Sequence, residues 1–157
     1  MEVAGERLAV LGERALYWPA RETLLIADPH FGKAASFRAN GIPVPDGTTG
    51  GTLARLTSVL AQTAARRLIC LGDLLHARAG RSEQTLATIT AWREQHPDLD
   101  WLLVRGNHDR HAGDPPAAWR VRCVDQPCRQ RPFVLRHEPA LSDDGYVLAG
   151  HVHPAAR

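Results

Sequence analysis

The sequence predicts a layered α/β domain, and two observations lead to this fold class. Three short apolar runs, TLLIA (23–27), RLICL (67–71) and WLLVR (101–105), have the length and composition of strands that are buried on both faces. Amphipathic helical patterns separate these runs, and shorter strand patterns follow residue 115. Because 157 residues is an ordinary size for one domain, we expect residues 1–157 to form a single domain.

The first predicted elements are a hairpin and two helices. The runs RLAVL and ALYW flank Gly12, Glu13 and Arg14, which favours an N-terminal antiparallel hairpin. The loop NGIPVPDGTTGG (40–51) joins the two helices, and its Gly and Pro content suits either a plain connector or a rim over an active site. The second helix begins near Thr48 and carries a set of apolar residues on one face: Leu53, Leu56, Val59, Leu60 and Ala64.

The later predicted elements are a third helix and three short strands. Ser82 and Glu83 open the helix, since serine is a favourable cap and an acid is favourable in the first turn. Leu86, Ile89 and Trp92 form its apolar face. The strands are WRVRCV, PFVLR and GYVLAG. The predicted order is therefore β-β-β-α-α-β-α-β, followed by β-β-β.

Composition and charge argue against a strongly basic nucleic-acid-binding protein, a secreted disulfide scaffold and a membrane protein. The net charge of +2 is too small to indicate nucleic-acid binding by bulk electrostatics. Lys33 is the single lysine among 19 Lys and Arg residues, which biased codon usage explains better than a selected phosphate-binding surface. Three cysteines without a repeated metal spacing favour a reducing compartment. No apolar run approaches the roughly 18 residues of a membrane span, and the charged start lacks a signal-peptide core, so we expect a soluble cytoplasmic protein without membrane contact.

Polar residues follow the end of five predicted strands. Ligands of α/β sheets bind beyond the carboxyl ends of the strands, where several loops converge. Each cluster taken alone is explained as well by a turn or by a core histidine, but five clusters in order predict one shared site. The clusters are Asp28-Pro29-His30, Gly72-Asp73, Gly106-Asn107-His108-Asp109, His137 and Gly150-His151-Val152-His153.

The residue types indicate a metal centre. Asp, Asn and His without Cys form a mixed oxygen and nitrogen set, which suits manganese, iron or zinc. The set exceeds what one tetrahedral ion needs, so we expect two ions roughly 3.5–4 Å apart with a bridging carboxylate. Such pairs clamp the attacking and leaving oxygens of a displacement at phosphorus, and they lower the pKa of a bridging water.

The ordered motifs D-x-H, G-D, G-N-H-D, H and G-H-x-H resemble those of the calcineurin-like metallophosphoesterases, and they span residues 28–153. The stretch DPHFGKAASFRANGIPVPDGTT (28–49) further resembles the bacterial DNA-ligase-associated branch of that superfamily. This resemblance implies a layered αββα sandwich and a phosphoesterase with two divalent ions, manganese above iron or zinc.

The resemblance also implies a role for each motif residue. One metal is held by Asp28, His30 and His153, and the second by Asn107, His137 and His151, with Asp73 as the bridge. His108 donates a proton to the leaving oxygen or stabilises charge at phosphorus, and Asp109 orients its imidazole. His76 is either an outer partner of the site or a solvated loop histidine.

Two departures from the family pattern stand out. Pro29 occupies a position that is usually not proline; it removes one backbone N–H but leaves the flanking side chains available, so we expect little effect on metal binding. Family members usually continue beyond G-H-x-H with further strands, whereas only residues 154–157 follow His153. We therefore expect a domain that is short at its C-terminus, with an incomplete second sheet.

The expected function is hydrolysis of phosphodiesters, in nucleic acid during DNA repair, with the metal-bridging hydroxide as the attacking group. The resemblance adds DNA ligase or other repair proteins as partners, and the chain acts as a monomer or a homodimer. Two alternatives stay open. A phosphomonoesterase or nucleotide phosphatase uses the same metal centre, and a non-catalytic, metal-stabilised scaffold binds a repair complex without turnover.

Overall fold

The computed structural model describes residues 1–45 and 47–152, and its main feature is a six-stranded sheet in the order β3-β4-β5-β6-β7-β8. The first three strands are antiparallel, and β5 to β8 are parallel. The bounds are β3 (Ala9–Leu11), β4 (Ala15–Trp18), β5 (Thr23–Ile26), β6 (Arg67–Cys70), β7 (Asp100–Val104) and β8 (Val121–Val124). The predicted hairpin is confirmed, since β3 and β4 pair through Val10 and Leu16.

A smaller sheet of three strands supplies the second layer. Its order is β11-β10-β9, with β9 and β10 antiparallel and β10 and β11 parallel. The bounds are β9 (Cys128–Gln130), β10 (Phe133–Arg136) and β11 (Tyr146–Ala149). A separate two-stranded ribbon precedes them at the N-terminus, formed by β1 (Glu2–Val3) and β2 (Glu6–Arg7).

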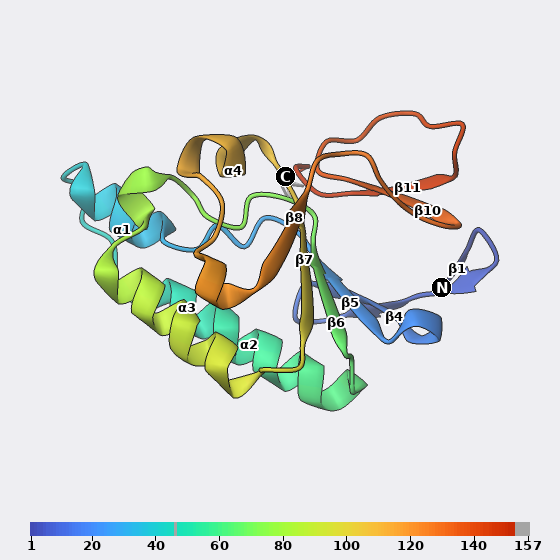
Figure 1. The fold of residues 1–157 in the computed structure, drawn as a ribbon, viewed down its shortest axis with the longest axis horizontal. Helices are drawn as coiled ribbons and strands as arrows, with labels where there is room; N and C mark the ends of the chain where they lie inside the picture. Colours follow the sequence, from blue (N-terminus) through green and yellow to red (C-terminus); the bar gives the residue numbers. More distant parts are fainter. Residues whose placement is uncertain (46, 153–157) are drawn as a thin grey trace.

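Helices cover the opposite face of the six-stranded sheet. Figure 1 shows α1, α2 and α3 on one side of this sheet, and β10 and β11 on the other. The bounds are α1 (Lys33–Ala39), α2 (Thr48–Thr63), α3 (Glu83–Gln95) and α4 (Asn107–Ala112), with short 3-10 turns at Pro19–Arg21, Arg78–Gly80 and Ala117–Trp119. None of the helices in the described part of the chain is long and apolar enough to cross a bilayer.

Side-chain alternation along the central strands produces two cores. On β7, Trp101 and Leu103 face the helices, whereas Leu102 and Val104 face the smaller sheet and pack with Phe133 and its neighbours. Burying each such side chain contributes roughly 1.5–3 kcal/mol. The prediction of strands buried on both faces is therefore confirmed, and so is the layered α/β fold class with a small second sheet.

The predicted helices are confirmed in position, and the predicted buried faces are confirmed except at Ala64, which is exposed. In α2, the side chains of Leu53, Leu56, Val59 and Leu60 are buried, whereas Ala64 ends the helix in a left-handed conformation. In α3, the Ser82 hydroxyl accepts a hydrogen bond from the Thr85 N–H, which satisfies one of the free donors of the first turn.

Three features go beyond the sequence prediction. The strand predicted in WRVRCV joins the main sheet as β8, parallel to β7, because the segment with α4 and buried Trp119 makes the crossover that parallel strands require. The GNHD stretch, read as a turn, is the first turn of α4. Strand β9 is an addition, since its CRQ sequence has no apolar run.

Packing of the sheet against the helices makes a prediction about stability. Leu103 on β7 is fully buried, whereas Leu141, in the loop before β11, is fully exposed. Replacing Leu103 by Ala should lower the free energy of unfolding by about 2–5 kcal/mol, because the smaller side chain leaves a cavity. Leu141→Ala is the matched control and should stay within about 0.5 kcal/mol of the wild type in urea denaturation. Equal losses in both variants would contradict the assigned core.

Candidate active site

The loop that follows β5 runs beside the loop that follows β6. The N–H of Asp28 donates to the Gly72 carbonyl at 3.2 Å, and the N–H of His30 donates to the Asp73 carbonyl at 3.0 Å. Pro29 lies between these two donors, so its missing N–H costs no hydrogen bond in this ladder. This backbone pairing extends beyond the end of the sheet, and it brings Asp28 and His30 next to Asp73.

Asp73 is the centre of the site, and its carboxylate is almost fully buried. Its Oδ1 accepts a hydrogen bond from the His108 N–H at 3.0 Å and lies 3.5 Å from His137 Nε2. Its Oδ2 lies 3.7 Å from His30 Nε2 and 3.9 Å from His108 Nε2. One carboxylate therefore faces residues from three other loops, as the predicted bridging role requires.

The glycines of two motifs make room for these side chains. A Cβ on Gly72 would lie 2.1 Å from His137 Nδ1, and the φ of +88° at Gly72 also disfavours a side chain. A Cβ on Gly106 would lie 2.3 Å from Asp73 Oδ1. The G-D and G-N-H-D motifs need glycine because an imidazole and a carboxylate fill the space beside the backbone.

His137 is fully buried after β10, and its hydrogen bonds fix its tautomer. Its Nδ1 lies 3.0 Å from the Leu71 carbonyl, which can only accept, so Nδ1 carries the proton. In the neutral ring, the lone pair is then on Nε2, which lies 2.9 Å from Asn107 Oδ1 and 3.0 Å from His151 Nδ1. A backbone carbonyl thus aims the free nitrogen of His137 at the centre of the site, as happens in metal-binding histidines.

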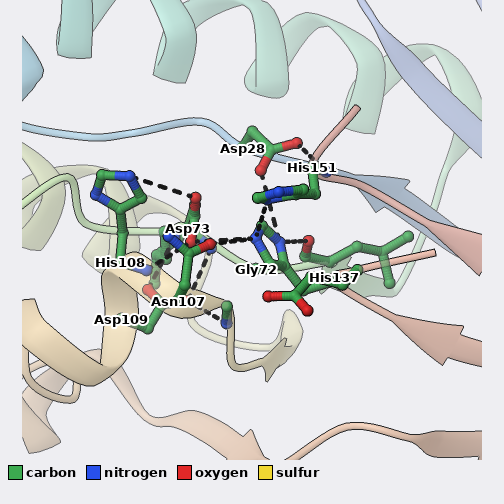
Figure 2. Close-up of polar contacts among 12 residues, drawn as sticks. Asp28, Gly72, Asp73, Asn107, His108, Asp109, His137 and His151 are labelled. Carbon is green, nitrogen blue, oxygen red and sulfur yellow. Dashed lines mark hydrogen bonds and ion pairs between the residues drawn. The ribbon is translucent and has the colours of Figure 1, made fainter. Parts of the chain in front are cut away.

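The G-H-x-H motif reaches the site from β11. The N–H of His151 donates to Asp28 Oδ2 at 2.9 Å, and its imidazole meets that of His137 edge to face with centroids 4.8 Å apart. Figure 2 shows Asp28 and His137 on either side of the His151 ring. His153, the other predicted ligand of this motif, lies outside the described residues.

The donor set fits metal ions. Oxygen and nitrogen atoms of Asp28, His30 and Asp73 lie within 4.8 Å of one another, and so do those of Asp73, His137 and His151. Asp73 belongs to both groups. Neighbouring ligands of one ion with bonds of roughly 2.1 Å lie about 3–3.5 Å apart, which agrees with the short spacings around His137 Nε2.

Two further observations favour cations at these positions. Asp28 Oδ1 is buried and has no hydrogen-bond partner among the described residues, which leaves an oxygen available as a ligand. Burial is the main cause that lowers the pKa of His30 to about 4; it outweighs the attraction of Asp73, and Lys33 adds to it, so the imidazole is neutral near pH 7. Only the neutral ring offers a lone pair to a metal.

His108 lies beside this donor set and is partly exposed. Its Nδ1–H donates to the His76 carbonyl at 2.7 Å, which fixes the ring and directs Nε2 toward the site. The rings of His76 and His108 are stacked, with centroids 5.0 Å apart, and His76 Nδ1 lies 3.4 Å from His30 Nδ1. Of the two interpretations of His76 at the sequence level, the contact geometry favours an outer partner that positions His108.

The expected contact between Asp109 and the imidazole of His108 is replaced by a different one. The carboxylate of Asp109 is buried and accepts hydrogen bonds from the backbone N–H groups of Gly106, Asp73 and Leu74 at 2.7–2.9 Å, and more weakly from Leu75. Burial raises its pKa, and these donors oppose that shift. Asp109 therefore joins the start of α4 to the loop after β6, and the role of orienting His108 falls to the His76 carbonyl.

Sequence reasoning also missed groups that position ligands. The Gln126 Oε1 accepts hydrogen bonds from the backbone N–H of His137 at 2.9 Å and of Glu138 at 3.1 Å, which holds the loop after β10. The Leu71 and His76 groups that fix the imidazoles are backbone carbonyls, which every residue type carries. The amino-acid sequence therefore holds no signal that could have identified these carbonyls. For Gln126, the only signal is a glutamine before a proline, which is weak evidence for a positioning role.

The assignment of Asp109 makes a prediction about stability. Asp109→Asn should lower the free energy of unfolding by about 3 kcal/mol or more, because an amide nitrogen cannot accept from the backbone donors that the carboxylate now satisfies. His108→Ala should cost much less, since that side chain is partly exposed. If Asp109 served only to orient His108, the two variants would be equally stable in urea denaturation.

Comparison with known proteins gives a match among solved structures. No protein-family model matches the chain, and no curated protein matches it. Among solved structures, the crystal structure of the Pseudomonas putida nuclease MPE is 49% identical in sequence and superposes with a TM-score of 0.89. The alignment covers 98% of this chain and 72% of that one. The chain therefore belongs to the same protein family as the Pseudomonas putida nuclease MPE.

Proposed function

We propose that the protein is a metal-dependent phosphodiesterase that cleaves nucleic acid, and that it belongs to the calcineurin-like metallophosphoesterases. The observation that carries the proposal is the convergence of five Asp, Asn and His clusters around the carboxylate of Asp73. The 49% identity with a protein that is called a nuclease supports nucleic acid as the substrate class.

Seven residues would hold the two divalent ions, with manganese as the preferred metal. Asp28, His30 and His153 would bind one ion, Asn107, His137 and His151 the other, and Asp73 both. When bound, the ions neutralise charge on the phosphoryl oxygens and make hydroxide available near neutral pH. The protein's part is to fix the ligands, through the Leu71 carbonyl at His137 and the backbone ladder at Asp28 and His30.

His108 would act on the leaving group. Its Nδ1–H is held by the His76 carbonyl, so a second proton on the ring is carried by Nε2, on the side that faces Asp73. From this atom the proton can pass to the oxygen that leaves phosphorus. The cationic ring also stabilises the negative charge that develops there.

The biological setting is a further part of the proposal. Resemblance of residues 28–49 to the DNA-ligase-associated branch supports a role in DNA repair in the cytoplasm, beside a ligase or other repair proteins. Co-purification of the native protein with a DNA ligase from its own cells would support this setting, and cleavage of nucleic acid without any such association would separate the activity from the partner.

Metal binding can be tested without reference to turnover. In calorimetric titration with Mn²⁺, the wild type should bind two ions per chain. Asp28→Asn should weaken one site and Asp73→Asn both, by roughly 100-fold or more, since even groups outside the ligand shell are worth about 10- to 100-fold.

The control for this titration is Asp144→Asn. Asp144 is exposed and pairs with Arg129, away from the site, so this variant should keep both ions. Loss of a single site in Asp73→Asn would contradict the bridging role of that carboxylate.

Catalysis can be tested on the same protein. The wild type should hydrolyse a chromogenic phosphodiester in the presence of Mn²⁺ and lose this activity with a chelator. His108→Ala should lower kcat by about 10²- to 10⁴-fold while the bound metal stays, because only the proton donor is removed.

The control is His96→Ala, which should keep full activity, since His96 follows α3 and its ring packs on Trp92, away from the donor set. Full activity in His108→Ala would overturn the proton-donor role. Two bound ions with no hydrolysis across phosphodiesters and phosphomonoesters would instead favour a scaffold, and preference for monoesters would favour a phosphatase.

A further inference from the structure

A groove of about 330 Å³ opens beside His30, between α1 and the start of α2. Its volume is at the lower end of the range of small-molecule sites, roughly 300–1,000 Å³. Apolar side chains dominate its walls, which include Pro29, His30, Lys33, Phe37, Val44 and Pro45. The groove therefore adjoins a proposed metal ligand directly, although none of its other walls belongs to the metal centre.

Hydrogen bonds hold the walls of this groove in place. The Arg38 guanidinium donates to the Val44 carbonyl at 3.2 Å and to the Pro45 carbonyl at 3.5 Å, which ties these two residues to α1. The Gly32 N–H donates to Thr49 Oγ1 at 3.2 Å, which ties the start of α1 to α2. The loop that the sequence left open as a connector or a rim thus forms one wall of a groove next to the candidate active site.

Aromatic and cationic groups lie at the same place. Phe37 is half-buried and lines the groove, with its ring edge to face against the His76 ring at 5.8 Å. The ammonium of Lys33, the single lysine of the chain, lies 5.8 Å from the centroid of the Phe37 ring. An aromatic ring beside a cation, next to a site for phosphorus chemistry, is the combination that binds a planar base and its phosphate.

A second, smaller groove continues this surface on the other side of Pro29. Its volume is about 130 Å³, it shares Pro29 and Thr52 with the first, and Arg14 and Arg55 line it beside Asp28. The two grooves together flank the Asp28–His30 loop. Guanidinium groups on this side suit a further phosphate of the same strand, which indicates a polynucleotide rather than an isolated mononucleotide.

We propose that the groove beside Phe37 is a nucleobase subsite: the base adjoining the cleaved bond stacks on Phe37, and Lys33 pairs with the phosphate of that nucleotide. This inference rests on the proposed function, because a nucleic-acid substrate at the metal centre is what brings a base to the groove. Stacking on an aromatic side chain tolerates every base, so the subsite anchors the strand and does not select a sequence.

The test is a double-mutant cycle in which the Phe37 side chain and one base of the substrate are removed separately and together. The substrate is an oligonucleotide with a single cleavable phosphodiester, used intact and with the base removed from the nucleotide on one side or the other of that bond. Wild type should lose about tenfold in kcat/KM when the stacked base is removed, chiefly through KM. In Phe37→Ala this loss should vanish, and in Phe37→Trp it should return. The measured quantity is the ratio of kcat/KM for the intact and the abasic substrate within each variant. A partly unfolded preparation lowers both values equally and leaves this ratio unchanged.

A second readout does not depend on turnover. The fluorescence of 2-aminopurine at the same position should be quenched on binding to metal-free wild type and much less on binding to Phe37→Ala. Lys33→Ala should weaken oligonucleotide binding in low salt, whereas Arg66→Ala, which removes an exposed cation at the far end of β6, should not. Ile42→Ala, on the same loop but outside the groove walls, is the matched apolar control.

The outcomes separate this inference from the function beneath it. If wild type cleaves the oligonucleotide and Phe37→Ala loses the same factor on base removal, the subsite is wrong and the function stands. If wild type cleaves no phosphodiester with Mn²⁺, the proposed function fails. Quenching that depends on Phe37 would still support the nucleobase subsite in that case. If such quenching were also absent, both the subsite and the proposed function would be wrong.

Discussion

The buried carboxylate of Asp109 is the interaction on which the site depends. It accepts hydrogen bonds from the backbone N–H groups of Gly106, Asp73 and Leu74, and so joins two loops that leave different strands of the sheet. Asn107 and His108 lie on one of these loops, and Asp73 on the other. The buried negative charge of the Asp109 carboxylate is tolerated because backbone N–H donors replace the water molecules that it loses on folding. Without it, the hydrogen bond from the His108 N–H to Asp73 Oδ1 would be the main direct link between these two loops.

The two sheets contribute unequal parts to the site. Parallel strands β5, β6 and β7 deliver Asp28, His30, Asp73 and Asn107 from one edge of the main sheet. The smaller sheet delivers His137 and His151, and these arrive together because β10 and β11 are also parallel. The close fit of His137 against Gly72 locks the second layer onto the first, since no side chain fits between them. Packing of the two layers therefore also brings the candidate ligands of both sheets together.

Backbone atoms do much of the positioning. The Leu71 carbonyl fixes the tautomer of His137, and the His76 carbonyl fixes that of His108. Each bond leaves the opposite ring nitrogen facing Asp73, where a lone pair can bind a metal or a proton can be transferred. Backbone carbonyls also position the wall of the groove beside Phe37, where Arg38 donates hydrogen bonds to the carbonyls of Val44 and Pro45.

The sequence by itself determined the central strands, the long helices and the residue types of the site. Periodicity and burial go together in β5, β6, β7 and α2, because an apolar run or an apolar face has few ways to leave water. The order of the Asp, Asn and His clusters, each after a predicted strand, also predicted that they share one site, although the two sheets that supply it were not told apart. Tertiary structure decided what letters cannot carry: that β8 joins the main sheet, that Asp109 binds backbone instead of His108, and that Phe37 and Lys33 border the site. These outcomes depend on which backbone donors and acceptors meet across the fold, and that is settled only when distant segments pack together.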